Sequence, residues 1–112
     1  MKYTKFTGLQ ADQVKGGVAG AVALTKSASY SLTAAEKAAP AVIVTMSAAS
    51  KVLTLGLADG QMMVVVNAGA TNAFTVKNVS GDTGTSLAAN ASKALLVIGN
   101  STANASTVIA LN

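Results

Sequence analysis

The chain has 112 residues, with eight lysines against four acidic residues and a formal net charge of +4. It contains no histidine and no cysteine, which excludes Ser-His-Asp and Cys-His catalytic groups, histidine metal ligands and thiolate zinc sites. Only 11% of its residues are charged, against about 25% in an average soluble domain, and this shortage predicts that another molecule covers much of its surface.

Residues 1–20 show no sustained hydrophobic period and hold four of the ten glycines, so we expect an extended N-terminal arm ahead of the folded domain. Tyr3, Phe6 and Leu9 lie three residues apart and form a small apolar stripe, with Lys2 and Lys5 beside them. Two interpretations are open, a flexible terminus and an arm that becomes ordered on a partner. Because aromatic side chains are favoured interface anchors, these five residues are the candidate binding residues of the arm.

Residues 21–112 consist of short segments rich in valine, isoleucine, leucine and threonine, separated by turn residues. Such segments are typical of strands. We expect strands at 21–25, 28–32, 41–47, 51–57, 61–67, 72–78, 91–99 and 106–112. Between the second and third of these, the sequence predicts one helical turn, with Thr33 as its N-cap, Glu36 completing a capping box and Pro40 closing the unit.

The turn residues indicate how the strands are connected. Asp59-Gly60 is the strongest hairpin signal in the chain and predicts a tight turn that joins 51–57 to 61–67, with a positive φ at Gly60. A polar loop is expected at 79–86. Short strands at this spacing, without alternating helices, predict an all-β fold, a small β-sandwich or jelly-roll-like domain over residues 21–112.

Two of the expected strands are apolar on both faces, in the stretches QMMVVVN (61–67) and ALLVIG (94–99). In a small two-sheet domain, one face of a sheet meets the core and the other meets water. An exposed apolar second face is an aggregation hazard, so we expect another copy of the chain or a larger assembly to cover it. The sequence predicts a homo-oligomer, with a trimer favoured over a dimer, whose interface contains Met62, Met63, Val64, Val65, Leu95 and Leu96.

The residues that carry chemistry are few. The four carboxylates are scattered, at Asp12, Glu36, Asp59 and Asp82. Asp82 lies in GDTG (81–84), which contains the Asp-Thr-Gly signature of an aspartic-protease half-site, but an Asp between glycines in a polar loop is explained by ordinary turn chemistry. A Ca²⁺ site that combines Asp82 with Asn78 or Ser80 is a weak alternative, because no EF-hand spacing accompanies it. We therefore expect no enzyme activity, no cofactor and no metal.

Two other classes of partner are disfavoured. Nucleic-acid readers cluster basic residues and use arginine and aromatic side chains, whereas this chain disperses its lysines and has no arginine. No apolar run approaches the roughly 20 residues of a membrane-spanning helix, and the N-terminus lacks the apolar region of a secretory signal peptide. We therefore expect neither nucleic acid nor membrane as partner, and another protein as the cover.

The tract from Lys51 to Asn112 combines four stretches: VLTLGLADGQMMVVVN, FTVKNVSGDTGTSL, KALLVIGNS and a closing VIALN. This tract resembles small bacteriophage virion proteins. In those proteins, one strand ends in an Asp-Gly turn, a second strand leads into a glycine-rich polar loop, and a final apolar strand follows. The resemblance is to capsid decoration or cement proteins, head-fibre proteins and trimeric tail-fibre modules. It implies an all-β, usually homo-oligomeric protein that binds the outer surface of the shell without catalysis.

The sequence therefore predicts a non-enzymatic, head-fibre-like capsid decoration or cement protein. It would bind the major capsid protein on the outer surface of the virion as a homo-oligomer and stabilise the shell. The alternative is a tail-fibre or receptor-binding β-module that attaches to host-surface glycans. The absence of tryptophan and the small number of aromatic residues disfavour this alternative, because sugar sites use aromatic platforms. A cellular adhesin domain is a third class, against which the missing signal peptide counts.

Overall fold

The computed structural model describes residues 20–89 and 93–112. These residues form strands and one helical turn, which confirms the predicted all-β class. The strands are β1 (Val22–Lys26), β2 (Tyr30–Ser31), β3 (Ala41–Met46), β4 (Lys51–Thr54), β5 (Met62–Asn67), β6 (Phe74–Lys77), β7 (Thr85–Leu87), β8 (Ala94–Ile98) and β9 (Thr107–Ala110), and the helical turn is α2 (Ala34–Lys37). Except for residue 20, the expected N-terminal arm lies outside the described residues.

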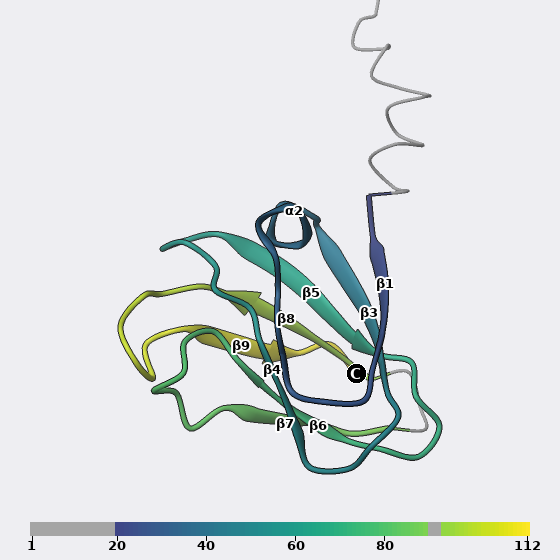
Figure 1. Cartoon of the computed structure of the whole chain (residues 1–112). Coiled ribbons are helices and arrows are strands. Elements are labelled where there is room, and N and C mark those ends of the chain that lie inside the picture. Colours follow the sequence, from purple (N-terminus) through teal and green to yellow (C-terminus); the bar gives the residue numbers. More distant parts are fainter. Residues whose placement is uncertain (1–19, 90–92) are drawn as a thin grey trace, which may run out of the picture.

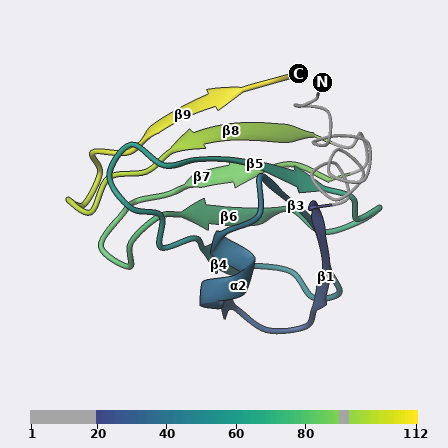
Figure 2. The same ribbon diagram turned by 90° about the horizontal axis from the view of Figure 1, so that it is seen from above.

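The strands form two sheets, which we name sheet A and sheet B. Sheet A has five strands in the order β1-β3-β5-β8-β9, and sheet B has four in the order β2-β4-β6-β7. From β1 to β6, successive strands alternate between the two sheets, so that neighbours within a sheet are parallel. Three antiparallel pairs, β5 with β8, β6 with β7 and β8 with β9, complete the sheets. Figures 1 and 2 show the chain passing repeatedly from one sheet to the other.

The parallel ladders reveal a structural period in the chain. Their partners are 23 residues apart in three cases, Tyr30 with Leu53, Val42 with Val65 and Lys51 with Phe74. The chain therefore winds around its core, and each winding contributes one strand to each sheet. A jelly roll is built from antiparallel strands, so these ladders do not support that part of the predicted architecture.

The prediction of a hairpin at Asp59-Gly60 is wrong. β4 lies in sheet B and β5 in sheet A, so the turn carries the chain across the core instead of joining neighbouring strands. Its local geometry is nevertheless as predicted, with a φ of 81° at Gly60. The N–H of Gln61 donates to the C=O of Ala58 at 3.0 Å and closes a four-residue turn that needs glycine at its third position.

A strand is found in each of the eight expected segments, shorter than expected in seven of them and shifted by one residue in β1. The one missed strand is β7, which begins inside the loop expected at 79–86. Its Leu87 pairs with Phe74 of β6 and is buried, whereas Thr85 and Ser86 are polar. One buried residue in a three-residue strand gives too short an alternation to be recognised.

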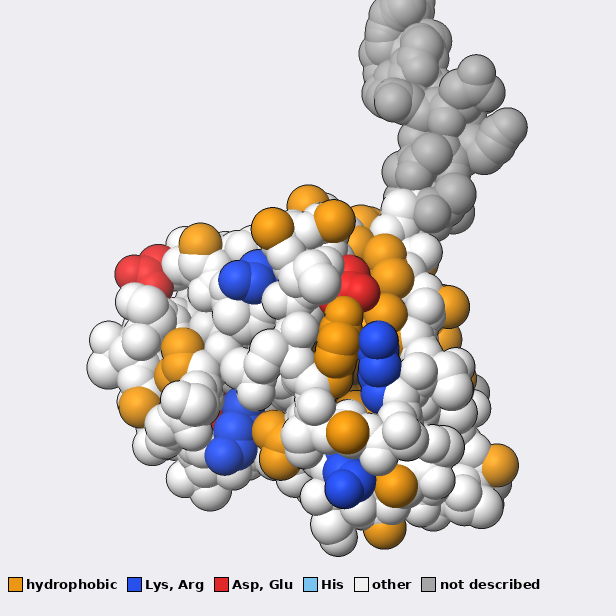
Figure 3. Space-filling view, viewed as in Figure 1, with side chains coloured by type: hydrophobic (Ala, Val, Ile, Leu, Met, Phe, Trp, Pro, Cys, Tyr) orange, Lys and Arg blue, Asp and Glu red, His pale blue; other side chains and the backbone are white. Residues whose placement is uncertain are grey.

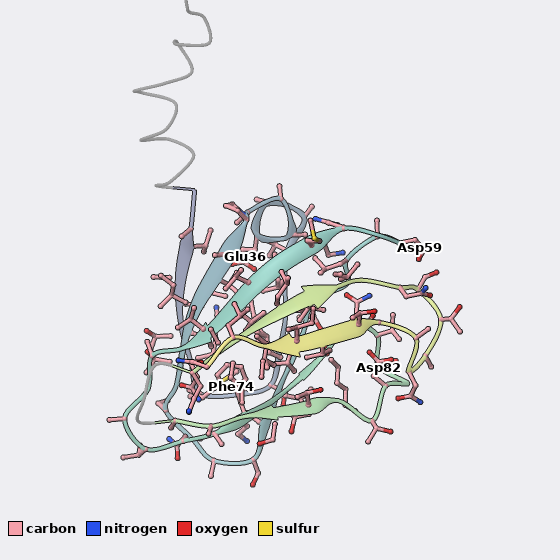
Figure 4. All side chains as sticks on the ribbon, turned by 180° about the vertical axis from the view of Figure 1, so that it is seen from behind. Glu36, Asp59, Phe74 and Asp82 are labelled. Carbon is pink, nitrogen blue, oxygen red and sulfur yellow. The ribbon has the colours of Figure 1, made fainter. Side chains whose placement is uncertain are left out.

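The core lies between the two sheets and consists of alternate residues of the strands. Val42, Val44 and Val65 from sheet A and Leu53 from sheet B are 0% exposed. Phe74, which is 2% exposed, lies between the sheets in Figure 4. Burial of a large aliphatic or aromatic side chain stabilises the fold by about 1.5–3 kcal/mol relative to leaving it exposed, so this layer is the main source of stability.

Two buried asparagines secure the chain where strands end. Asn67, at the end of β5, donates to the C=O of Asn72 and of Leu87 and accepts from the N–H of Gly69. Asn78, directly after β6, accepts from the N–H of Leu57 and donates to its C=O. These side chains supply hydrogen bonds to backbone groups that have no ladder partner beyond the strand end. This explains why two polar residues are buried in the core.

The expected capping box of α2 is confirmed. The Thr33 side chain accepts from the N–H of Glu36, and the Glu36 carboxylate accepts from the N–H of Thr33 at 2.8 Å. The same carboxylate accepts from the Tyr30 hydroxyl at 2.7 Å. The backbone N–H of Thr33 and the Tyr30 hydroxyl are the two largest causes of the lowered pKa of Glu36, in that order.

Substitution of Gly60 tests the crossing turn. We expect Gly60→Val to lower the free energy of unfolding by about 1–3 kcal/mol, because a β-branched residue resists positive φ. A Cβ at this position would have no neighbour within 4 Å, so the loss would come from the backbone alone. Urea unfolding measures it, with Gly60→Asn as the control that tolerates positive φ. Equal stability of the two variants would contradict the assignment.

Candidate interaction surface

Sheet A presents one face to the core and one away from it, which we name the outer face. Side chains alternate along a strand, so the residues between buried positions point outward. In β5, Met63 is 1% exposed whereas the preceding Met62 is 59% exposed. The centre of the outer face is formed by Ile43, Met62, Val64, Val66, Leu96 and Ile98.

These side chains form continuous rows across the strands. Val64 pairs with Ala41 of β3 on one side and with Leu96 of β8 on the other. Leu96 in turn pairs with Ile109 of β9. Directly opposed residues in a sheet have Cβ atoms about 4.5–5.5 Å apart and touch, so the row is one apolar surface that crosses four strands.

The outer face is also uncharged. Among the described residues, every outward position on the strands of sheet A is alanine, threonine or a larger apolar residue. Figure 3 shows lysine and acidic side chains scattered among hydrophobic and other side chains on the face seen there. A contiguous apolar patch without charge is typical of a surface that binds protein.

The structure divides the six residues expected at an oligomer interface into two groups. Met63, Val65 and Leu95 point into the core of their own chain and are at most 4% exposed. They are therefore not available to a second chain. Met62, Val64 and Leu96 lie together on the outer face. The five candidate residues of the arm, Lys2, Tyr3, Lys5, Phe6 and Leu9, lie outside the described residues.

The loop that contains Asp82 is held by hydrogen bonds from its own chain. The Asp82 carboxylate is 8% exposed and accepts from three backbone N–H groups, those of Asn78, Val79 and Asn104. Burial raises its pKa and is the largest single influence, but the donors, led by Asn104, outweigh it and the pKa is lowered. Asp82 thereby ties the 79–84 loop to the loop between β8 and β9, which gives it a structural role.

Three of the four carboxylates belong to the described residues. Figure 4 shows Glu36, Asp59 and Asp82 in separate parts of the fold. No group of three or more acidic residues that would hold a metal ion occurs within 20–89 and 93–112. A cavity of about 140 Å³ borders the Asp82 loop and is lined by Val76, Val97 and Val108 among others. Since three backbone donors occupy the one carboxylate there, the cavity does not present a free acid.

Comparison of the chain with family models, with curated proteins and with solved structures finds no match. In the part of the chain that the structure describes, the helical content is too short to cross a membrane.

The role of Asp82 predicts a pH dependence. A carboxyl whose pKa is lower in the folded chain stabilises the fold above its unfolded pKa of about 3.9, and this contribution disappears as the pH falls through the folded pKa. We expect Asp82→Asn to melt at a lower temperature than the parent chain at pH 7, since an amide cannot accept from all three donors.

The difference in melting temperature should shrink as the pH falls below the unfolded pKa of about 3.9 and through the lower folded pKa, because the parent chain then loses the same ionised group. Thermal unfolding followed by circular dichroism measures it, with Asp59→Asn as a control, since Asp59 is exposed and accepts one backbone hydrogen bond, from the N–H of Ser101. A difference that stays constant over this pH range would contradict the role of the Asp82 carboxylate.

Proposed function

We propose that the protein is a non-enzymatic decoration or cement protein of a bacteriophage capsid. It binds the outer surface of the shell through the major capsid protein, acts as a homo-oligomer and makes the shell harder to open. The uncharged outer face of sheet A is the observation that carries the proposal. The resemblance of residues 51–112 to phage virion proteins supplies the kind of assembly.

The outer face supports a partner protein over a small-molecule substrate. Met62 and Ile43 are 59% and 38% exposed, although both are large and apolar. Exposed residues of this kind cost little singly, but a connected group of them favours a covered state. A standard protein interface buries about 1,600 Å² in total, and repeated over many sites it opposes shell opening by mass action.

The arm supplies the contact with the shell in this proposal. Tyr3, Phe6 and Leu9 are apolar anchors, and Lys2 and Lys5 steer the arm toward an acidic surface. The sheets supply the contact between copies and any further contact with the shell. A trimer is the oligomer that the sequence and the resemblance favour, with a dimer second.

The glycan-binding alternative receives less support. Sugar readers use exposed aromatic platforms, but of the two aromatic residues in the described part of the chain, Phe74 is buried in the core. The other, Tyr30, is packed against that core, with its ring under the ammonium group of Lys26 at 3.9 Å. The two roles also differ in copy number, since a decoration protein co-purifies with virions in many copies and a fibre module in few.

Deletion of residues 1–15 tests the arm. We expect the truncated chain to remain folded and oligomeric but to occupy shells that lack the decoration protein far less than the full chain does. Tyr3→Ala with Phe6→Ala should reproduce much of the loss, whereas Lys2→Gln with Lys5→Gln should act through salt-sensitive association. Sedimentation of shells with bound protein measures occupancy. Full occupancy by the truncated chain would assign shell binding to the β-domain.

A charge on the outer face tests the surface itself. We expect Val64→Glu to leave the chain folded, because Val64 points away from the core, and to lower shell occupancy or oligomer formation at least about tenfold, which corresponds to about 1.4 kcal/mol. Ser86→Glu is the matched control, because it adds the same charge at an exposed position of sheet B. Equal binding by the two variants would remove the outer face from the proposal.

A further inference from the structure

β9 is the edge strand of sheet A, and all four of its residues are exposed. Figure 2 shows it at the margin of the sheet, beside β8. The strand is apolar on both faces: Val108 on the inner side is 36% exposed and Ile109 on the outer side is 44% exposed. Leu111, which follows, is 50% exposed. No other strand in the described chain combines an open edge with two apolar faces.

The hydrogen-bond phase of β9 shows which backbone groups point to the open edge. The N–H of Leu111 donates to the C=O of Ala94 in β8 at 3.0 Å. In an antiparallel ladder, alternate residues bond to the same neighbour, so Ile109 and Thr107 also turn toward β8. Val108 and Ala110 therefore turn their N–H and C=O groups outward, where no described strand follows.

The other described edges are protected in ways that β9 is not. β2 and β7, the edges of sheet B, have two and three residues. β1, the opposite edge of sheet A, ends in Lys26. Short length and lysine are the usual devices that stop edge strands from pairing with other chains. The stretch 107–111, TVIAL, contains no charge, proline or glycine, so its edge is suited to receive another strand.

We propose that β9 pairs antiparallel with β9 of a second copy of this chain, about a twofold axis at Ile109. In this register Val108 lies opposite Ala110 of the second copy, and the outward groups of both residues close four hydrogen bonds across the axis. Ile109 lies opposite its own counterpart as a non-hydrogen-bonded pair. The contact is isologous, so it closes as a dimer.

Both the side chains and the charges favour a second copy as the added strand. The register places the larger Val108 against the smaller Ala110 on the inner side, and Thr107 against Leu111 on the outer side. Two chains of net charge +4 repel each other, but neither β9 nor the outer face adds a charged residue to this contact. A strand from a different protein would need the same length and the same freedom from charge.

The pairing joins the two copies of sheet A into one continuous sheet and places their outer faces side by side. The pairing is the contact between copies in the homo-oligomer, and in this respect it rests on the proposed function. It predicts a dimer in place of the trimer that the sequence favours. Met62, Val64 and Leu96 then remain uncovered and available to the shell. Tests on the purified chain without shells separate this pairing from shell binding.

A single cysteine at the axis tests the register. The chain has no cysteine of its own, so any disulfide must join two copies. Opposed residues of a non-hydrogen-bonded pair have Cα atoms about 4.5 Å apart, within the range of about 4.4–6.8 Å that a disulfide spans. We expect Ile109→Cys to form a covalent dimer under mild oxidation, measured by non-reducing gel electrophoresis.

Thr107→Cys is the matched control. In the same register its Cα lies four residues, or about 13 Å, from its counterpart, too far for a disulfide. We expect at least about tenfold less covalent dimer from it than from Ile109→Cys, whereas Thr107→Cys with Leu111→Cys should cross-link again. Equal cross-linking by the two single variants, or none by Ile109→Cys, would overturn the pairing.

Removal of one outward donor gives an independent test by light scattering. Ala110→Pro deletes an N–H that only the second copy uses, and proline is tolerated on an open strand edge. We expect the parent chain and Ala110→Val to be dimers at micromolar concentration and Ala110→Pro to be a folded monomer. A monomeric parent chain would overturn the pairing, even if the protein binds shells. Intact dimers that fail to bind shells would instead overturn the proposed function.

Discussion

The interleaving of the two sheets is the constraint on which the rest of the structure depends. Each strand from β1 to β6 belongs to the opposite sheet from the strand before it, so neither sheet forms without the other. The parallel ladders join residues 20 positions apart between β1 and β3 and 23 apart in the other three cases. The entropy cost of closing these loops is offset only when both sheets meet across the core. Burial of valines and leucines between the sheets offsets this entropy cost, so the chain folds with few aromatic residues.

The same winding creates strand ends at which the backbone has to leave one sheet for the other. Asn67 lies at one of these positions, and Asn78 bonds to Leu57 in another, the segment between β4 and β5. The amides of the two asparagines bond to the backbone of residues up to 22 positions away. Asp82 does the same for the loop that follows β6. Asn78 and Asp82, which the sequence offers as candidates for a Ca²⁺ site, therefore bond to the backbone of these connections.

That surface follows from the pleat of sheet A. Each strand gives its core-facing residues to the interior and presents the intervening ones outside, and in β5 and β8 both sets are apolar. The core between the two sheets buries only the core-facing set. Protein cover for the second set is the basis of the proposed capsid role, whereas the proposed pairing of β9 uses the open edge of the same sheet.

The sequence by itself determined features that depend on neighbouring residues: the strands, the capping box at Thr33 and Glu36, the positive φ of Gly60, and the presence of a second apolar face. Local propensity and alternation act over a few positions, and these are readable in order along the chain. Only the tertiary structure decided which strands pair, that the Asp59-Gly60 turn crosses the core, that β7 exists, and that Met63 is buried while Met62 is exposed. Those outcomes depend on contacts between residues that are distant in sequence, 13 positions for Phe74 with Leu87 and 23 for Val42 with Val65. The 23-residue spacing leaves no sequence repeat because each ladder requires only apolar side chains of suitable size.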